Sequence, residues 1–473
     1  MSFCFPLKKP FLGATAFSLV ATLAASPVLA GEDVQDMLRQ MNARLQQLEQ
    51  RNQALEQEVK TLRQAAAPAP AAAARIEQLE QRVKELAEAP HEHEAGGASG
   101  VEIGGSFVAV HQKANKDGVA AGNATSATNY RGDVEVSLPA GTLGGAQGTA
   151  FAHVRFGQGG GLGLRNTHVG VPNSLAFEQA TNTNATREDS FAILAQAHYT
   201  LTWPLAAAKA EGQPGDRVEL TVGKMDFFGF FDQNEAAGDE ASQFLNNAFV
   251  HNALLDTGGD IAADNYGFAP GMRLAYYNEG NADFGWGASL GVFASGNGAN
   301  FSDKVSGGPL TIVQFEVAPK QADGEKSGNY RLYAWTNGRT QDLNSVQQRH
   351  GGWGISADQK VAGDWNLFGR YGKRTSGDGA FDTAFTAGFE LAGASWNRGE
   401  DAVGLGLGWL KTGQAQQIAS GIGGKEKLVE LYYRAKLNEQ IEVSPHVQYI
   451  RDPEGDASAP TVKIFGLRAG MSF

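Results

Sequence analysis

The chain has 473 residues, of which 61 are glycine and one is cysteine, and its formal charge is −12 at pH 7. An acidic chain argues against nucleic acid as a partner, because such a partner needs a basic surface. The glycines follow no Gly-x-y period, which excludes collagen. The single cysteine, Cys4, excludes a disulfide framework and a cysteine-based metal site.

Residues 1–30 have the pattern of a secretory signal peptide. Two lysines form a positive start, residues 11–25 are uncharged and mostly apolar, and residues 28–30 offer a small-residue cleavage site. A membrane-anchor helix is the alternative, but the apolar run is shorter than the ~20 residues that span a bilayer. We predict an exported protein whose mature chain begins at Gly31 and lacks cysteine.

Residues 31–64 contain a heptad repeat that predicts an α-helical coiled coil. Apolar residues are spaced alternately three and four apart, as in the seam of a coiled coil. They are Leu38, Met41, Leu45, Leu48, Leu55, Val59 and Leu62, with Asn52 as the one polar seam residue. In one interpretation Asn52 sets register or strand number, and in the other it is a neutral interruption. The apolar stripe predicts self-association, with a trimer favoured over a dimer.

Residues 65–100 form an alanine- and proline-rich linker with a short second helix. Two prolines end the first helix, a helical pattern returns over residues 76–86, and a polar, glycine-rich strip follows. His91 and His93 in this strip suggest a metal site in one interpretation. We favour a polar linker, because two histidines on a flexible strip have no fixed geometry.

From residue 101 to residue 473 the helical period gives way to short alternating segments separated by glycine and polar residues. Residues 133–138 and 217–222 alternate strictly, and about seventeen such segments occur. Their spacing fits transmembrane strands of ~9–11 residues with turns between them. Because bacterial barrels have an even number of strands, we predict an all-β transmembrane barrel of sixteen or eighteen strands.

The last nine residues form the most informative strand. One face carries Phe465, Leu467, Ala469, Met471 and Phe473, and the other carries Gly466, Arg468, Gly470 and Ser472. An apolar face toward lipid and a polar face toward a lumen are typical of a membrane barrel. A soluble β-sandwich also alternates, but the terminal aromatic residue resembles the signal that barrel-assembly machinery reads. We therefore favour the membrane barrel.

The same alternation predicts which side chains line the pore. The candidates are Arg155, Arg273, Arg331, Tyr333, Trp335, Arg370, Arg434, His446 and Arg468. Arginine is a planar donor suited to hydroxyl and carboxylate oxygens, and aromatic rings suit the apolar face of a sugar. These residues predict a wide polar channel with a positive and aromatic lining. The alternative is that any water-filled barrel carries charged residues on its inner face.

A long segment between predicted strands, residues 227–264, is a candidate for an inward-folding constriction loop. It carries four acidic residues, Asp232, Glu235, Asp239 and Glu240. If the segment folds into the barrel, we expect these acids to oppose the arginines of the wall. This hypothesis rests on the length and the charge of the segment.

Several strings resemble the carbohydrate-selective porins of Gram-negative bacteria. They are residues 223–226, 231–234, 243–246 and 248–252, and in the tail 430–434, 444–450, 452–453 and 466–473. The resemblance covers about residues 215–473 and is weaker over 101–214. It implies a sixteen-stranded outer-membrane barrel and passive, sugar-preferring diffusion. Relatives with an S-layer-type module before the barrel are thought to pass inorganic ions, and this chain has a coiled coil in that place.

No enzyme motif competes with this interpretation. There is no HExxH, and a GxSxG occurs at residues 287–291. A nucleophile elbow needs a strand, a sharp turn and a helix, whereas this string lies within an alternating, glycine-rich segment. We therefore expect neither an enzyme nor a cofactor.

The sequence thus predicts a passive porin in the outer membrane of a Gram-negative bacterium, with an N-terminal stalk in the periplasm. Its expected partners are outer-membrane lipid, copies of itself, and small sugars or ions as solutes, with the cell wall as a further candidate. Two alternatives remain open, a pore for inorganic or metal ions and a structural tether between outer membrane and cell wall.

Overall fold

The computed structural model describes residues 100–473 except 179–189, 206–214, 298–299, 322–323 and 362. The N-terminal predictions lie outside the described residues. They are the signal peptide at 1–30, the coiled coil at 31–64 with Asn52, and the linker at 65–100 apart from Gly100.

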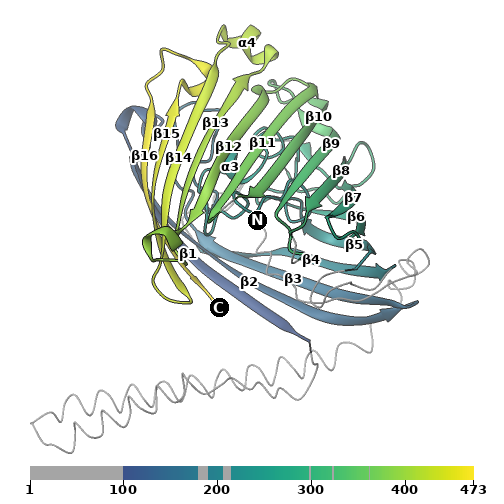
Figure 1. The fold of residues 1–473 in the computed structure, drawn as a ribbon. Coiled ribbons are helices and arrows are strands. Elements are labelled where there is room, and N and C mark those ends of the chain that lie inside the picture. Colours follow the sequence, from purple (N-terminus) through teal and green to yellow (C-terminus); the bar gives the residue numbers. More distant parts are fainter. Residues whose placement is uncertain (1–99, 179–189, 206–214, 298–299, 322–323, 362) are drawn as a thin grey trace, which may run out of the picture. The chain divides into compact units, whose positions relative to one another are not determined.

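The described residues form a closed barrel of sixteen antiparallel strands, which confirms the smaller of the two predicted strand numbers (Figure 1). The strands are β1 Glu102–Ala114, β2 Ser126–Leu143, β3 Ala146–Gln158, β4 Phe191–Pro204, β5 Arg217–Asp226, β6 Phe268–Asn278, β7 Phe284–Phe293, β8 Leu310–Pro319, β9 Gly328–Gln341, β10 Gln347–Lys360, β11 Trp365–Ser376, β12 Phe381–Ala392, β13 Ala402–Thr412, β14 Lys425–Lys436, β15 Ile441–Arg451 and β16 Val462–Ser472. Each strand pairs with its sequence neighbours, so the topology is a simple meander.

The first and last strands close the barrel. Val110 of β1 lies opposite Arg468 of β16, and the amide of Phe473 donates to the carbonyl of Gly105 at 3.0 Å. Closure leaves no strand edge with unpaired backbone groups, as a membrane requires. On β16, Phe465 is 60% exposed on the outside and Arg468 is 1% exposed on the inside, which confirms the predicted faces of this strand.

The outer face is apolar. Leu274, Leu290, Val313 and Leu332 on β6 to β9 are all exposed large hydrophobic residues. Their strand neighbours point inward, because side chains alternate along a strand. An outward apolar band of this kind meets lipid in membrane barrels.

The two ends of the barrel differ. At the turn end, connections such as residues 144–145 and 279–283 are short, and both ends of the barrel segment lie there; at the loop end, connections such as 159–190, 227–267 and 294–309 are long. In bacterial outer-membrane barrels short turns face the periplasm and long loops face outside.

Short helical turns occur in the connections. They are η2 Lys116–Gly118, α3 Asn247–Val250, η4 Gly393–Trp396, α4 Gln414–Ser420 and η5 Pro453–Gly455. No helix in the described part of the chain is long and apolar enough to cross a bilayer. The GxSxG string at 287–291 lies in the middle of β7, paired with β6 and β8, without the turn and helix of a nucleophile elbow.

Candidate functional site: the barrel interior

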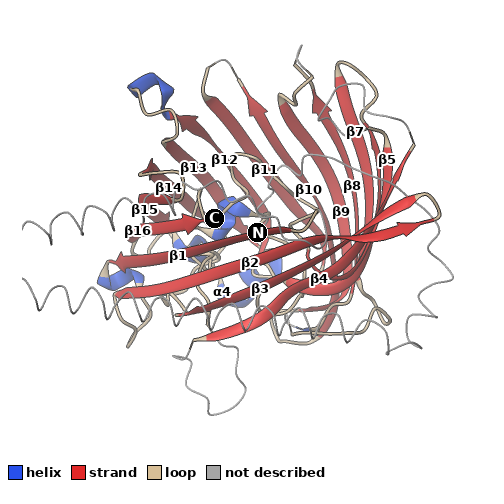
Figure 2. Ribbon diagram, turned by 90° about the horizontal axis from the view of Figure 1, so that it is seen from below, coloured by secondary structure: helices blue, strands red, loops and turns tan. Residues whose placement is uncertain are grey.

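The connection between β5 and β6, residues 227–267, crosses the interior of the barrel, and we call it the inward loop. Its Glu240 binds Arg131 on β2 at 2.7 Å, and its Asp232 accepts a 2.6 Å hydrogen bond from Tyr333 on β9. Only a segment inside the ring can reach walls so far apart in strand order. Figure 2 shows some of the helical turns inside the ring of strands and others at the ends of the barrel.

Arginines from the wall hold the backbone of the inward loop. Arg370 donates to the carbonyls of Ala237 and Phe249, both at 2.7 Å, and also binds the carboxylate of Asp232. Arg468 donates to the carbonyls of Glu240 and Gln243. A loop without regular structure needs partners for its buried carbonyls, and a guanidinium supplies up to five N–H donors in one plane.

A carboxylate of the wall accepts hydrogen bonds from backbone amides of the inward loop. Glu430 on β14 accepts the amides of Leu245 and Asn246, both at 2.9 Å. A 2.8 Å contact to the imidazole of His446 holds this carboxylate in place. Charged hydrogen bonds of this kind contribute about 1.5–3 kcal/mol each when buried, so the loop is tied down from several strands at once.

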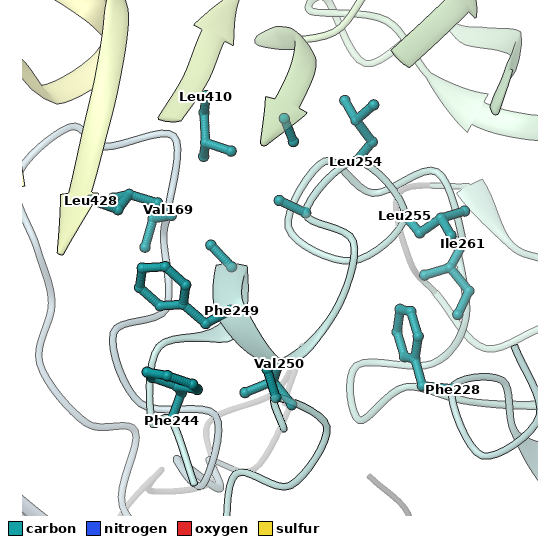
Figure 3. Packing of buried hydrophobic residues seen from close by; sticks show 14 of the residues in the cluster. Val169, Phe228, Phe244, Phe249, Val250, Leu254, Leu255, Ile261, Leu410 and Leu428 are labelled. Carbon is teal, nitrogen blue, oxygen red and sulfur yellow. The ribbon is translucent and has the colours of Figure 1, made fainter. Parts of the chain in front are cut away.

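Aromatic residues fill the space between the inward loop and the wall. Phe244 and Phe249 pack together at a centroid distance of 5.3 Å, and Phe244 meets Tyr432 of β14 edge-on at 5.0 Å. All three are essentially buried. Figure 3 shows this packing, with Leu410 and Leu428 pointing from the strands toward Val169. Part of the lumen is therefore a packed apolar core.

Glycines on the inner face make room for this core. A Cβ at Gly406 would lie 2.8 Å from the ring of Phe249, and one at Gly372 would lie 2.5 Å from the side chain of Asn252. The glycine-rich strands of the sequence thus have a steric cause at these positions, because the loop approaches the sheet too closely for a side chain.

A second connection covers the inward loop at the loop end. Residues 159–178, which we call the cap loop, present the amides of His168 and Val169 to Glu426 of β14 at 2.7 and 2.9 Å. The carbonyl of Pro172 accepts from Gln448 of β15 at 2.8 Å. Burial lowers the pKa of His168 to about 4, so its imidazole is neutral at pH 7.

Two of the cavities in the described part of the chain lie beside the packed core. The outer cavity, of about 490 Å³, lies at the loop end between the cap loop, the inward loop and the β2–β3 wall. The inner cavity, of about 570 Å³, lies at the turn end among β1, β14, β16 and residues 239–242 of the inward loop. The inward loop separates the two.

One ion pair lies where the cavities approach each other. Arg131 lines the outer cavity and pairs with Glu240. Asp239 and Ala241, which flank Glu240 in the sequence, line the inner cavity. Burial alone would raise the pKa of Glu240, but the guanidinium of Arg131 and further positive groups such as Arg155 together outweigh burial and lower that pKa. Glu240 is therefore charged at neutral pH.

A carboxylate on the wall, Asp133 of β2, also binds Arg131. Asp133 accepts from Arg131 at 2.9 Å and from Arg155 at 2.6 Å, and it contacts His153 at 2.7 Å. Alternation on β2 and β3 places these groups on one inner face.

All nine pore-lining candidates lie on the inner face, but in a setting that differs from the expected wide channel. Their hydrogen-bond or ion-pair partners are Asp133 for Arg155, Glu219 for Arg273, the Gln233 carbonyl for Arg331, Asp232 for Tyr333, Asp260 for Trp335, the Asp232 carbonyl for Arg370, Glu390 for Arg434, Glu430 for His446 and the Glu240 carbonyl for Arg468. Most of these side chains are buried. Arg155, Arg273 and His446 bind carboxylates of the wall, whereas the other six candidates bind the inward loop. This loop fills space that the sequence-based prediction assigned to water.

Of the four predicted acids of the inward loop, two bind arginines of the wall and two do not. Asp232 and Glu240 oppose arginines of the wall as expected. Asp239 instead accepts from the amide of Ala241 within its own loop at 2.7 Å. Glu235 meets Lys360 at 3.0 Å, with both side chains 48% exposed.

Sequence reasoning missed three residues that hold the interior together. Arg131 and Arg374 could have been found by extending alternation from Asp133 and from Arg370, since two and four residues along a strand return to one face. Asp260 carries no such signal, because it lies in an irregular segment; it binds Arg374 at 2.8 Å and Trp335 at 2.9 Å.

A closed sixteen-stranded barrel with an apolar outer face and a loop folded into its lumen defines an outer-membrane protein of the porin class. The sequence model described as carbohydrate-selective porin, OprB family, matches residues 123–473. The chain belongs to this family, whose members are channels rather than enzymes.

Individual relatives are more distant. The structure of Pseudomonas putida OprB at high pH matches with a TM-score of 0.58 at 17% identity, covering 83% of this chain and 96% of that chain. A protein of Aquifex aeolicus (strain VF5), described as uncharacterized, is 24% identical over 237 residues. That match covers 50% of this chain and 60% of the relative's length. The solved structure supports the fold.

Proposed function

We propose that this protein is an outer-membrane porin through which small hydrophilic solutes, chiefly sugars, diffuse passively. The family assignment supports this proposal. The observation that carries it is the lining of the outer cavity, which combines the aromatic residues Phe177, Phe228 and Tyr266 with planar polar groups. Concave sites that combine apolar surface with a few placed polar groups bind small molecules.

The proposed path leads through the outer cavity, past the Arg131–Glu240 pair and into the inner cavity. Aromatic faces would cover the apolar face of a sugar ring, and amides such as Asn173 and Asn247 would exchange hydrogen bonds with its hydroxyls. Binding along a pore must be weak and repeated so that the solute also leaves. No covalent step is involved.

Sugar block of the ion current in planar bilayers tests this function. Glucose and maltose should reduce the current of the purified protein in a saturable manner. Tyr266→Ala should weaken the block, whereas Tyr276→Ala, on the outer face next to Trp286, should leave it unchanged. A current that no sugar alters, from channels that otherwise conduct, would contradict the sugar preference.

We also propose that residues 31–64 assemble the porin into an oligomer, with a trimer favoured, and form a periplasmic stalk that can reach the cell wall. The heptad repeat supports self-association. Removal of residues 31–90 should then leave a monomeric barrel in detergent, as measured by light scattering. A truncated barrel that stays oligomeric would show that the stalk does not assemble it.

A further inference from the structure

The charged side chains that line the two cavities are predominantly acidic. The outer cavity is lined by Arg131 and Arg155 and by Glu178, Asp226, Asp256 and Asp264. The inner cavity is lined by Arg434 and Lys436 and by Asp239, Glu400, Glu439 and Glu442. Among the described residues, each lining therefore has two basic and four acidic groups, and 2 − 4 gives −2 for each cavity.

The arginines of the outer cavity contribute little net field. Arg131 and Arg155 share Asp133, and Arg131 also binds Glu240. Two positive and two negative groups in contact give 2 − 2 = 0 for this cluster. The two arginine side chains are only 2% and 3% exposed, whereas the side chain of Asp256 is 28% exposed. Asp226 is also buried, and Asp264 pairs with Lys224 at 3.1 Å. The carboxylates that a solute meets in the outer cavity are therefore Asp256 and the half-buried Glu178, which together carry a charge of −2.

The inner cavity repeats this arrangement. Arg434 is held by Glu390 at 3.2 Å and by the carbonyl of Ser242 at 3.1 Å. Glu400 and Glu439 lie on turns at the mouth and are exposed to water. Arg434 is thus paired, and the exposed carboxylates Glu400 and Glu439 outnumber the other cation of this lining, the half-buried Lys436.

We propose that the pore selects solutes by charge, passing cations and uncharged sugars in preference to anions such as uronic acids and sugar phosphates. This inference rests on the proposed function, because it requires the solute path to run through both cavities. The specificity-determining side chains are the accessible carboxylates of the two cavities. The arginines that line the two cavities are paired with Asp133, Glu240 and Glu390, so an anion meets no unpaired guanidinium among these lining residues.

The expected size follows from elementary electrostatics. A net charge of −2 at about 8 Å in water, screened at about 0.1 M salt, favours a monovalent cation over an anion roughly five-fold. At about 1 M salt the Debye length falls to about 3 Å, and the preference should fall toward unity.

Reversal potentials of the full-length protein in planar bilayers under a KCl gradient give the first test. We expect potassium to be favoured over chloride roughly five-fold at low salt, with the ratio shrinking at high salt. Efflux of glucosamine, glucose and glucuronate from proteoliposomes gives the second, with glucuronate expected to be the slowest of these similar-sized sugars. Chloride preference, or glucuronate as fast as glucose, would overturn the proposal.

Variants of the acidic residues test the contributions of the outer and the inner cavity to selectivity separately. Asp256→Asn should lower the potassium-to-chloride ratio, and Glu400→Gln combined with Glu439→Gln should lower it from the other end through exposed turn positions that the fold tolerates. Asp303→Asn removes the same charge from an exposed loop that lines neither cavity and should change nothing. If the acidic variants and Asp303→Asn behave alike, these carboxylates do not set selectivity. Sugar block without a cation preference would contradict the charge selectivity proposed here but would still support the proposed sugar function.

Discussion

The inward loop has two faces of different chemistry. The face toward β9, β11 and β14 is packed with Phe244 and Phe249 and held by arginines, and the face toward β2 and β3 meets water in the outer cavity. On the packed face a charged side chain serves the loop backbone, so it acts as structure. On the water-facing side the accessible charges can act on a solute. The same residue types thus have different roles on the two sides of one loop.

The strongest test of the packed face is Arg370→Met. The substitution removes hydrogen bonds to Asp232, Ala237 and Phe249 and leaves a buried carboxylate uncompensated. Loss of one partner of a buried ion pair costs about 3–5 kcal/mol. Heat-induced unfolding in detergent, followed by gel mobility, should shift to lower temperature. The double variant Arg370→Met with Asp232→Asn should be less destabilised; if it is worse, the stranded charge is not the cause.

A pH series tests the charge on Asp260. Burial alone would raise the pKa of Asp260, but the guanidinium of Arg374 and the hydrogen bond from His350 outweigh it and lower that pKa below 3.8. A lowered folded-state pKa adds stability above the ordinary pKa, and this stability is lost as pH falls through the folded-state value. Asp260→Asn should therefore cost about 1.5–3 kcal/mol at pH 7. Its unfolding temperature should approach that of the wild type below pH 3.8, and a constant gap at all pH values would contradict the charge argument.

The apolar part of the packed face is tested by Phe244→Leu. Phe244 is fully buried inside the barrel, whereas Phe315 is 47% exposed on the outer face. Loss of part of a buried ring costs about 1–2 kcal/mol, so Phe244→Leu should lower the unfolding temperature measurably. Phe315→Leu is the matched control and should have little effect. Equal effects would mean that the interior core adds nothing beyond the lipid-facing contacts.

The smallest effect is expected at Glu235, three residues from Asp232 in the same loop. Its pair with Lys360 is 48% exposed on both sides, and exposed ion pairs contribute about 0–1 kcal/mol. Glu235→Gln should leave the unfolding temperature within measurement error. A shift as large as that of Arg370→Met would show that exposure does not separate the two sets of charges.

Local patterns account for what could be predicted about the fold. Alternation on β16 showed that Phe465 faces out and Arg468 faces in, because the direction of a side chain in a strand depends only on its parity. The same parity placed Arg155, Arg273 and Arg370 on the inner face. Spacing and the even-number rule limited the strand count to sixteen or eighteen, and the resemblance to carbohydrate-selective porins implied sixteen.

Partners could not be predicted in this way. Parity says that Arg370 and Arg468 point inward, but their acceptors are carbonyls of a loop more than a hundred residues away in sequence. Asp239 and Glu240 are adjacent and equally acidic, yet only Glu240 accepts from a wall arginine in a 2.7 Å contact. Which acid meets an arginine depends on the path of the loop backbone.

The sequence by itself therefore determined the barrel, its inward and outward faces, and the segment that folds into the lumen, because each follows from periodicity, length and charge over short stretches. Only the tertiary structure decided what the lumen contains. The inward loop brings aromatic residues and carbonyls against the wall arginines, because a buried guanidinium and a buried carbonyl must find partners. That packing turns an expected arginine-lined channel into a partly filled barrel whose accessible cavity charges are mainly carboxylates.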